Sequence, residues 1–278
     1  MFKKYIKYIS LSLVLILLAG LFTACGSDKI EIGVVIGTTF AEEVETWEKV
    51  DEVKLYADDN RTLQELSSGR IDGVVSDKLV GLINIKEGGF DNLKLADGLI
   101  YKETIAVAVR QEDDSLRQAV NNALAEIIED GTYAKISKKY FNKDILEGVK
   151  YEKTFPNEKP ANDGSLQRVK DAGEIKFAMS GGYPPFNYFT EDDELTGFDV
   201  EIGKAVAEKL GVKYIPVTTE WNGILEGLRS DRYDGIFGSM GVTEKRLEVV
   251  DFTDPYYYSG AQLIVRKDSK IEGYEELK

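Results

Sequence analysis

The sequence contains no histidine and a single cysteine, and these two shortages exclude several kinds of site. Without histidine, the chain has no Ser-His-Asp triad, no histidine metal site and no histidine proton shuttle. One cysteine forms neither an internal disulfide nor a thiolate zinc cluster. We therefore expect no metalloenzyme site of the usual kinds.

Positive charge is also scarce. The 278 residues carry 35 Lys and Arg against 49 Asp and Glu, which gives a formal net charge of −14. Such a chain is a poor partner for nucleic acid or for an anionic bilayer surface. With 43% hydrophobic residues, it is long and apolar enough to form two lobes, each with its own core.

The one long apolar run lies at the N-terminus. Lys3, Lys4 and Lys7 precede the run 11–21, which is too short for a confident membrane span and has the layout of a secretory signal. Cys25 ends a group of small residues that resembles a bacterial lipobox. This predicts a signal peptide over 1–24, a Cys25 that carries fatty acyl chains such as palmitate, and a tether over 25–28. The alternative is an uncleaved anchor helix, and both place the body of the protein outside the cytoplasmic membrane, attached to it.

Beyond this segment, short β-branched runs alternate with amphipathic segments, which predicts an α/β fold. We expect strands at 32–36, 53–56, 74–75, 93–95, 105–109, 175–179, 233–237 and 261–265. We expect helices at 41–50, 60–68, 115–128, 132–141, 166–169, 200–210 and 221–230. Residues 157–164 show no periodicity, which indicates a linker.

A weak internal repeat relates the two halves. The segments 63–73 and 225–235 share the spacing of their leucines and a final Asp-Gly, and each is followed by an apolar run that ends in polar residues. Two lobes built from βα units explain this repeat. Sheets of this kind bind ligands beyond the carboxyl ends of their strands.

The segment 238–246 is the strongest candidate for binding an anion. Small residues allow close approach of the backbone, and Thr243 is placed to cap a short helix that carries Arg246. The guanidinium of Arg246 matches a carboxylate in shape and charge. The alternative for this segment alone is a surface turn with a solvated arginine.

Several motifs together resemble bacterial extracellular solute-binding proteins of family 3, the amino-acid-binding subunits of ABC importers. The motifs are Tyr183-Pro-Pro-Phe186, Gly197-Phe-Asp199, 238–246, 251–256, 33–39, Gly69-Arg70-Ile-Asp72 with Asp77, and 130–141. The resemblance covers nearly all of residues 29–278. It implies a two-lobed, hinged fold of the periplasmic-binding-protein type II, and a monomer that delivers an amino acid to an ABC permease. This binding function needs neither a cofactor nor catalytic residues.

The order of the motifs departs from the family. There the Tyr-Pro-Pro-Phe half comes first, and a segment like 271–278 leads directly into the strand that here begins near residue 32. We therefore predict a circular permutation. Lobe 2 comprises 29–105 and 268–278, lobe 1 comprises 106–149 and 165–267, and 150–164 is a linker. The rival interpretation is that the gene continues past Lys278 into another second lobe.

The resemblance also implies roles for individual residues. Arg246 binds the α-carboxylate of the ligand, and Asp77 accepts from its α-ammonium. Further contacts to these two groups are implied for Ser239, Thr39, Gly238 and the backbone near Gly241 and Thr38. The side-chain pocket is walled by Tyr183, Phe186 and Trp221, although Phe186 could equally be a core residue and Trp221 a packing residue.

Ligand specificity is expected to be for a polar or uncharged amino acid, because 180–182 carry no acidic residue. Two other function classes stay open. One is an enzyme on the same fold, such as a cyclohexadienyl-dehydratase-like lyase, with Glu220 as the acid to check. The other is a ligand-sensing module.

Overall fold

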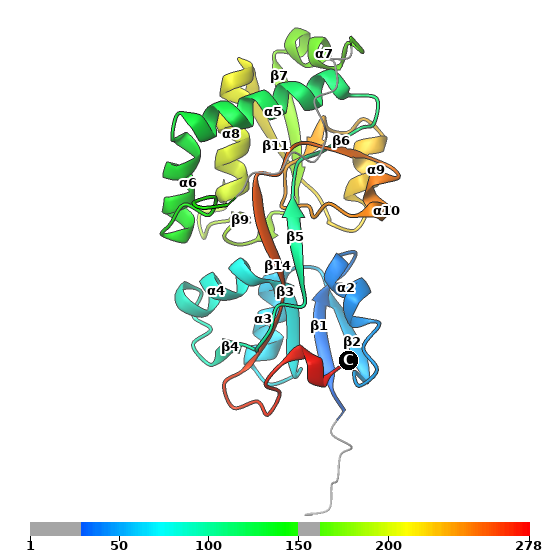
Figure 1. The fold of residues 1–278 in the computed structure, drawn as a ribbon, viewed down its shortest axis with the longest axis vertical. Coiled ribbons are helices and arrows are strands. Elements are labelled where there is room, and N and C mark those ends of the chain that lie inside the picture. Colours follow the sequence, from blue (N-terminus) through cyan, green and yellow to red (C-terminus); the bar gives the residue numbers. More distant parts are fainter. Residues whose placement is uncertain (1–28, 150–161) are drawn as a thin grey trace, which may run out of the picture.

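The computed structural model describes residues 29–149 and 162–278 and shows two α/β lobes (Figure 1). The predicted signal peptide, Cys25 and most of the predicted linker lie outside the described residues. Within the described ranges, no helix combines the length and the apolar character that crossing a membrane requires.

Lobe 2 is built on a sheet with the strand order β2-β1-β3-β14-β4. Strands β1 to β3 are parallel, and β14 is antiparallel to β3. The strands are β1 (Glu31–Val35), β2 (Glu52–Tyr56), β3 (Gly73–Asp77), β4 (Leu93–Leu95) and β14 (Tyr257–Arg266). The helices are α2 (Thr39–Val44), α3 (Asp59–Ser67) and α4 (Lys78–Glu87), with a short 3-10 turn at Tyr274–Glu276.

Lobe 1 repeats this arrangement with the strand order β11-β7-β12-β6-β13. Its strands are β7 (Glu174–Met179), β11 (Lys213–Thr218), β12 (Gly235–Ile236), β6 (Ala108–Val109) and β13 (Asp251–Phe252). A small sheet of β8 (Gly182–Tyr183), β9 (Asn187–Phe189) and β10 (Leu195–Thr196) lies beside it. The helices are α5 (Asp114–Glu129), α6 (Thr132–Phe141), α7 (Ser165–Ala172), α8 (Phe198–Leu210), α9 (Ile224–Arg229) and α10 (Glu244–Leu247).

The two sheets confirm the repeat seen in the sequence. In each lobe a central strand, β1 in lobe 2 and β7 in lobe 1, has a parallel neighbour on each side. One of these neighbours, β3 in lobe 2 and β12 in lobe 1, also pairs with an antiparallel strand. Strand β11, helix α4 and the β8–β10 sheet were not predicted. The helix predicted at 41–50 is shorter, because α2 ends at Val44 and the chain turns to bury Trp47.

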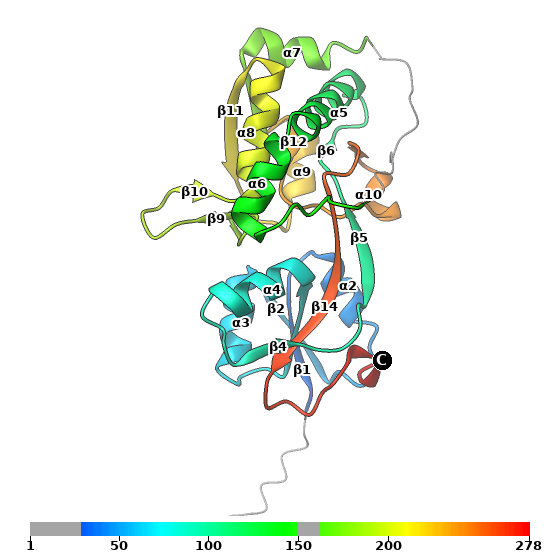
Figure 2. The same ribbon diagram turned by 60° about the vertical axis from the view of Figure 1, so that its left-hand side comes forward.

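Two paired strands connect the lobes. Strand β5 (Tyr101–Ile105) runs antiparallel to β14, with Ser259 opposite Glu103. Figure 2 shows both strands passing from one lobe to the other. The far half of β14 belongs to lobe 2, because Ala261–Val265 pair with β3. The predicted lobe 1 segment 165–267 therefore extends too far at its C-terminal end, since an apolar run alone does not say which sheet it joins.

An aromatic cluster fills lobe 1 between the main sheet and its helices. Phe186 is fully buried and stacks between Tyr183 and Tyr257, with ring centroids 5.3 Å and 4.9 Å away. Phe198 at the start of α8 packs edge-on against Tyr257 at 6.1 Å. Rings in contact on several sides make this cluster a rigid support for the loop that precedes it.

We predict that Phe186→Ala lowers the free energy of unfolding by about 3–5 kcal/mol, because it removes a fully buried ring. The matched control is Phe189→Ala, since this ring on β9 is 45% exposed. Urea denaturation of both variants measures the difference. Equal, small effects would show that Phe186 does not support the fold.

Candidate ligand-binding site

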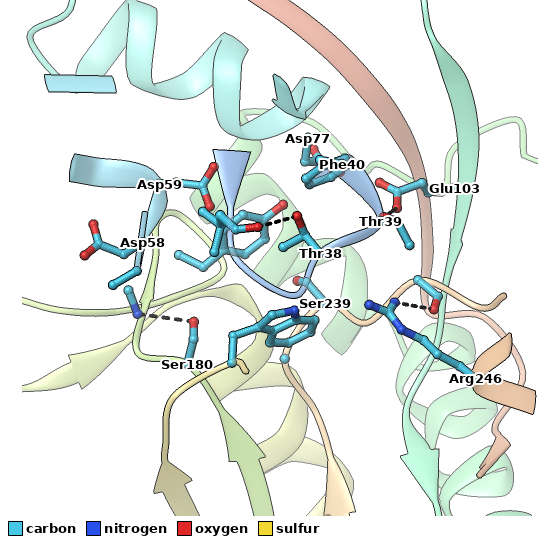
Figure 3. Close-up of a pocket in the computed structure, with 17 residues that line it drawn as sticks. Thr38, Thr39, Phe40, Asp58, Asp59, Asp77, Glu103, Ser180, Ser239 and Arg246 are labelled. Atoms are coloured by element: carbon cyan, nitrogen blue, oxygen red, sulfur yellow. Dashed lines mark hydrogen bonds between the residues drawn. The ribbon is translucent and has the colours of Figure 1, made fainter. Parts of the chain in front are cut away.

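A cavity lies between the lobes, at the carboxyl ends of the parallel strands of both sheets. This is where ligands bind in open α/β sheets. Its empty volume, open solvent at the mouth included, is about 570 Å³. The lining residues, most of them labelled in Figure 3, are Val35, Thr38, Thr39, Phe40, Ala57, Asp58, Asp59, Asp77, Glu103, Ser180, Gly182, Tyr183, Trp221, Gly238, Ser239, Gly241 and Arg246.

Arg246 provides the cationic end of the cavity. Thr243 caps α10 by accepting from the Arg246 backbone N–H at 3.2 Å, and Nη1 of Arg246 donates to the Gly241 carbonyl at 2.8 Å. The guanidinium lies 5.8 Å from the ring centre of Trp221. Among the described residues, no carboxylate comes within 4.0 Å of it. Burial lowers the pKa of Arg246, so an anion from outside would be a favourable partner.

Asp77 faces this end from lobe 2, at the last position of β3. Its Oδ1 caps α4 by accepting from the backbone N–H groups of Leu79 and Val80, at 2.6 Å and 3.4 Å. Its Oδ2 is buried and makes no hydrogen bond of regular geometry among the described residues, and the nearby Ser259 hydroxyl of β14 partly offsets the rise of its pKa. Burial raises the pKa of Asp77 to about 6. An unsatisfied acceptor at a cavity wall suits a donor supplied by a ligand.

Glu103 is a site residue that the sequence analysis missed. It lies on the crossing strand β5, is only 9% exposed, and accepts from Thr39 Oγ1 at 3.2 Å. Burial, reinforced by the nearby charge of Asp77, raises the pKa of Glu103 to about 8. The sequence offered one signal for Glu103, an acidic residue inside an otherwise strand-like stretch. This signal did not identify a site residue, because the neighbours of Glu103 on other strands were unknown.

Asp58 and Asp59 were also missed. Both stand at the start of α3, where Asp58 Oδ1 accepts from the Arg61 backbone N–H at 2.8 Å. Asp59 is 5% exposed and accepts a short hydrogen bond from Ser76 Oγ. Burial raises the pKa of Asp59 to about 7. In the sequence the pair indicates only a helix cap, which Asp58 indeed provides.

The hydroxyl groups expected to bind a carboxylate are already engaged within the protein. Ser239 Oγ donates to Asp199 at 2.8 Å, and its backbone N–H donates to the Tyr256 hydroxyl at 2.9 Å. Thr39 Oγ1 donates to Glu103 at 3.2 Å, and the neighbouring Thr38 Oγ1 donates to the Val35 carbonyl at 2.6 Å. These three side chains line the cavity or support its floor, but in this arrangement they present oxygen acceptors rather than donors.

The aromatic residues divide into two groups. Tyr183 and Trp221 line the cavity, and Trp221 Nε1 donates to the Gly37 carbonyl of lobe 2 at 3.2 Å. Phe186 is not a lining residue, because it is packed beneath Tyr183 in the core. The core alternative considered for Phe186 is therefore the correct one. Glu220 is exposed and does not line the cavity.

Polar contacts hold the lobes together around the cavity. Lys245 of α10 forms a short ion pair with Glu42 of α2, and Asn84 Nδ2 donates to the Pro184 carbonyl at 3.4 Å. With the Trp221 contact, these bring lobe 1 against lobe 2 at several points. Arg246 and the acids of lobe 2 therefore line the same cavity. No group of three or more acidic or cysteine side chains within the described ranges is placed to hold a metal.

A family model matches two parts of the chain. Residues 19–143 and 175–275 match the model of the bacterial extracellular solute-binding proteins, family 3. The matched parts include every lining residue of the cavity.

Individual relatives match shorter segments. The L-cystine-binding protein TcyJ of Escherichia coli is 36% identical over 120 residues, which cover 42% of this chain and 45% of that protein. The L-arginine-binding protein of Pseudomonas aeruginosa is 34% identical over 97 residues, 35% of this chain and 38% of that protein. The chain therefore spans about half the length, or less, of these relatives. The solved domain 1 of TmArgBP in its arginine-bound form is 32% identical and covers 37% of this chain and 85% of that domain, with a TM-score of 0.33.

The buried carboxyls of the cavity lead to a prediction about pH. A carboxyl whose pKa is higher in the folded than in the unfolded chain stabilises the fold below its unfolded pKa of about 4, and this contribution is lost as the pH rises through the folded value. Asp77, Asp59 and Glu103 reach about 6, about 7 and about 8. We predict that the melting temperature of the ligand-free protein falls from pH 5 to pH 8.

Above pH 7 most of this fall comes from Glu103. Glu103→Gln should therefore reduce the fall in melting temperature between pH 7 and 8, whereas Glu112→Gln, at an exposed position, should not. Melting followed by circular dichroism at each pH measures the effect. A Glu103→Gln variant with the full wild-type decline would contradict the assignment.

Proposed function

Because the chain belongs to family 3 of the bacterial extracellular solute-binding proteins, we propose that it binds a free amino acid between its lobes and delivers it to an ABC permease. The observation that carries the proposal is that, in the described part of the chain, an unpaired cation and an unsatisfied carboxylate oxygen lie on opposite walls of the cavity. Arg246 of lobe 1 has no acidic partner within 4.0 Å among the described residues, and Asp77 of lobe 2 has an unsatisfied oxygen. An amino acid offers a carboxylate and an ammonium on one carbon, which answers both needs.

Binding is then explained by two charged contacts from different lobes. The α-carboxylate pairs with Arg246, whose orientation is held by the Gly241 carbonyl. The α-ammonium donates to Asp77 Oδ2, and Glu103 is close enough to Asp77 and Arg246 to interact with both electrostatically. Each contact gains strength because Asp77 is buried and Arg246 is partly buried. The ligand thus favours the closed arrangement by linking the lobes.

Gly238 and Gly241 keep the expected role as backbone contacts in this proposal, and the backbone near Thr38 and Thr39 contributes from lobe 2. Ser239 acts differently from the expectation. Since its donors are engaged by Asp199 and Tyr256, it holds the floor of the cavity in place. Tyr183 and Trp221 enclose the ligand side chain.

The proposal extends to the location of the protein. The family is extracytoplasmic by its description, and the N-terminal lipobox-like segment supports attachment to the membrane through an acylated Cys25. A monomer is sufficient for this function, because one chain supplies both walls of the cavity. The relatives are named as binding proteins, and Glu220 is exposed and does not line the cavity, which favours binding over lyase chemistry.

We also propose that the chain is a circular permutation of the family order. The supporting observation is that its two described ends meet in lobe 2. The Leu277 carbonyl accepts from the Lys49 backbone N–H at 3.1 Å, and the Ile30 carbonyl accepts from the Asp51 backbone N–H at 2.9 Å. Lys49 and Asp51 are two residues apart, so these partners are separated by at most about 7 Å of chain. Lys278 also pairs with Glu43 at 3.0 Å.

The binding proposal predicts that Arg246→Ala weakens amino-acid binding by about a hundredfold or more, because the ligand carboxylate loses its partly buried cationic partner. The fold should be unaffected, since the cap of α10 uses only the backbone of residue 246. Titration calorimetry with a panel of amino acids measures affinity, and Arg229→Ala, an exposed arginine of lobe 1, is the control. Unchanged affinity in Arg246→Ala would refute the assignment.

The permutation proposal predicts that a chain rearranged to the family order folds and binds as the natural one does. In that variant a short Gly-Ser linker joins residue 278 to residue 29, and new ends are opened within 150–161. The expected result is a single cooperative melt and an affinity within about threefold of the natural chain, because no described contact is lost. A rearranged chain that fails to fold would count against the permutation.

A further inference from the structure

The charges that line the cavity do not balance. Four carboxyl side chains and one guanidinium line the cavity. Lys245 at the rim adds no unpaired positive charge, because it is paired with Glu42. A zwitterionic amino acid brings one positive and one negative group, so it leaves the surplus of acid unchanged. Burying unpaired carboxylates is costly, and a ligand that carries additional positive charge would reduce that cost.

The surplus is concentrated away from Arg246. Figure 3 shows Arg246 on one side of the cavity and Asp58 and Asp59 on the opposite side, with Asp77 between them. Asp58 packs directly against β8 of lobe 1 at this end, since a Cβ added at Gly182 would lie 3.0 Å from Asp58 Cβ. The cavity is thus polar at both ends, with opposite charges.

Asp58 and Asp59 have hydrogen-bond partners in the protein but no cation. Ser76 donates to Asp59, and the start of α3 donates to Asp58, while no Lys or Arg of the described residues lies within 4.0 Å of either carboxylate. This wall is continuous with the contact proposed for the α-ammonium. Ser76, the partner of Asp59, directly precedes Asp77 in β3, and Asp77 is 1% exposed.

From this arrangement we propose that the ligand is an amino acid whose side chain ends in a cationic group, and that Asp58 and Asp59 receive this group. The inference rests on the proposed function, in which Arg246 and Asp77 hold the α-carboxylate and α-ammonium. It reverses the expectation of a polar or uncharged side chain. That expectation considered only 180–182 of lobe 1, whereas the acids at this end come from lobe 2.

The first test compares ligands that differ only in the charge of the side chain. Titration calorimetry of the full chain at pH 7.5 uses L-lysine against L-norleucine and L-arginine against L-citrulline. We expect one or both cationic ligands to bind at least about tenfold more tightly than their neutral counterparts, because the neutral ones leave the acids unpaired.

The second test uses variants that keep the hydrogen bonds and remove the charge. Asp59→Asn retains an oxygen for Ser76, and Asp58→Asn retains a cap for α3, so both should fold, which thermal melting verifies. The double variant should lose the preference for cationic ligands and keep its affinity for the neutral ones within a few fold. Asp192→Asn, at an exposed turn residue of lobe 1, is the charge-matched control.

The outcomes separate the two proposals. Neutral and cationic ligands that bind equally well, with binding lost in Arg246→Ala, would overturn the cationic subsite and leave the amino-acid site standing. The same conclusion follows if the double variant keeps the wild-type preference. A correctly folded protein that binds none of the common amino acids would overturn the proposed function and the subsite together.

Discussion

The pairing of β5 with β14 is the constraint on which the rest of the structure depends. These two strands carry the chain between the lobes, and their hydrogen bonds fix where lobe 1 stands relative to lobe 2. The same pairing places Glu103 at the cavity, because a residue in the middle of a crossing strand necessarily lies between the lobes. A hinge formed by two strands therefore also contributes a wall of the site.

Buried acids make this cavity unfavourable when it is empty. Burial raises the pKa of Asp59, Asp77 and Glu103, which means that part of the population holds these groups neutral near pH 7. Such unpaired groups reduce stability, and proteins commonly tolerate that loss at functional sites. Here it has a direct use. A ligand that supplies positive charge pairs with the buried carboxylates and offsets the free energy lost by burying them. This gain adds to the affinity for a cationic ligand.

The support beneath the cavity is rigid by contrast. Asp199 accepts hydrogen bonds from Asn187, Ser239 and Tyr256, each at 2.8 Å, and the aromatic cluster packs around the same residues. Ser239 has φ near +59°, a left-handed backbone that this network holds in place. The floor of lobe 1 is therefore preorganised.

The sequence alone determined the α/β class, the repeated βα units and the short helix that carries Arg246. Each of these depends on local patterns, namely apolar runs, caps and the spacing of leucines, which are the same wherever the segment lies. The resemblance of the sequence motifs to the family also singled out Asp77, Tyr183 and Trp221. The tertiary structure decided the rest.

Glu103, Asp58 and Asp59 became site residues only when strand register and lobe closure brought them to one space, and Phe186 proved to be core because neighbours on α8 and β14 cover it. The physical reason is that burial and charge balance are sums over residues distant in the chain, and no local pattern records those sums.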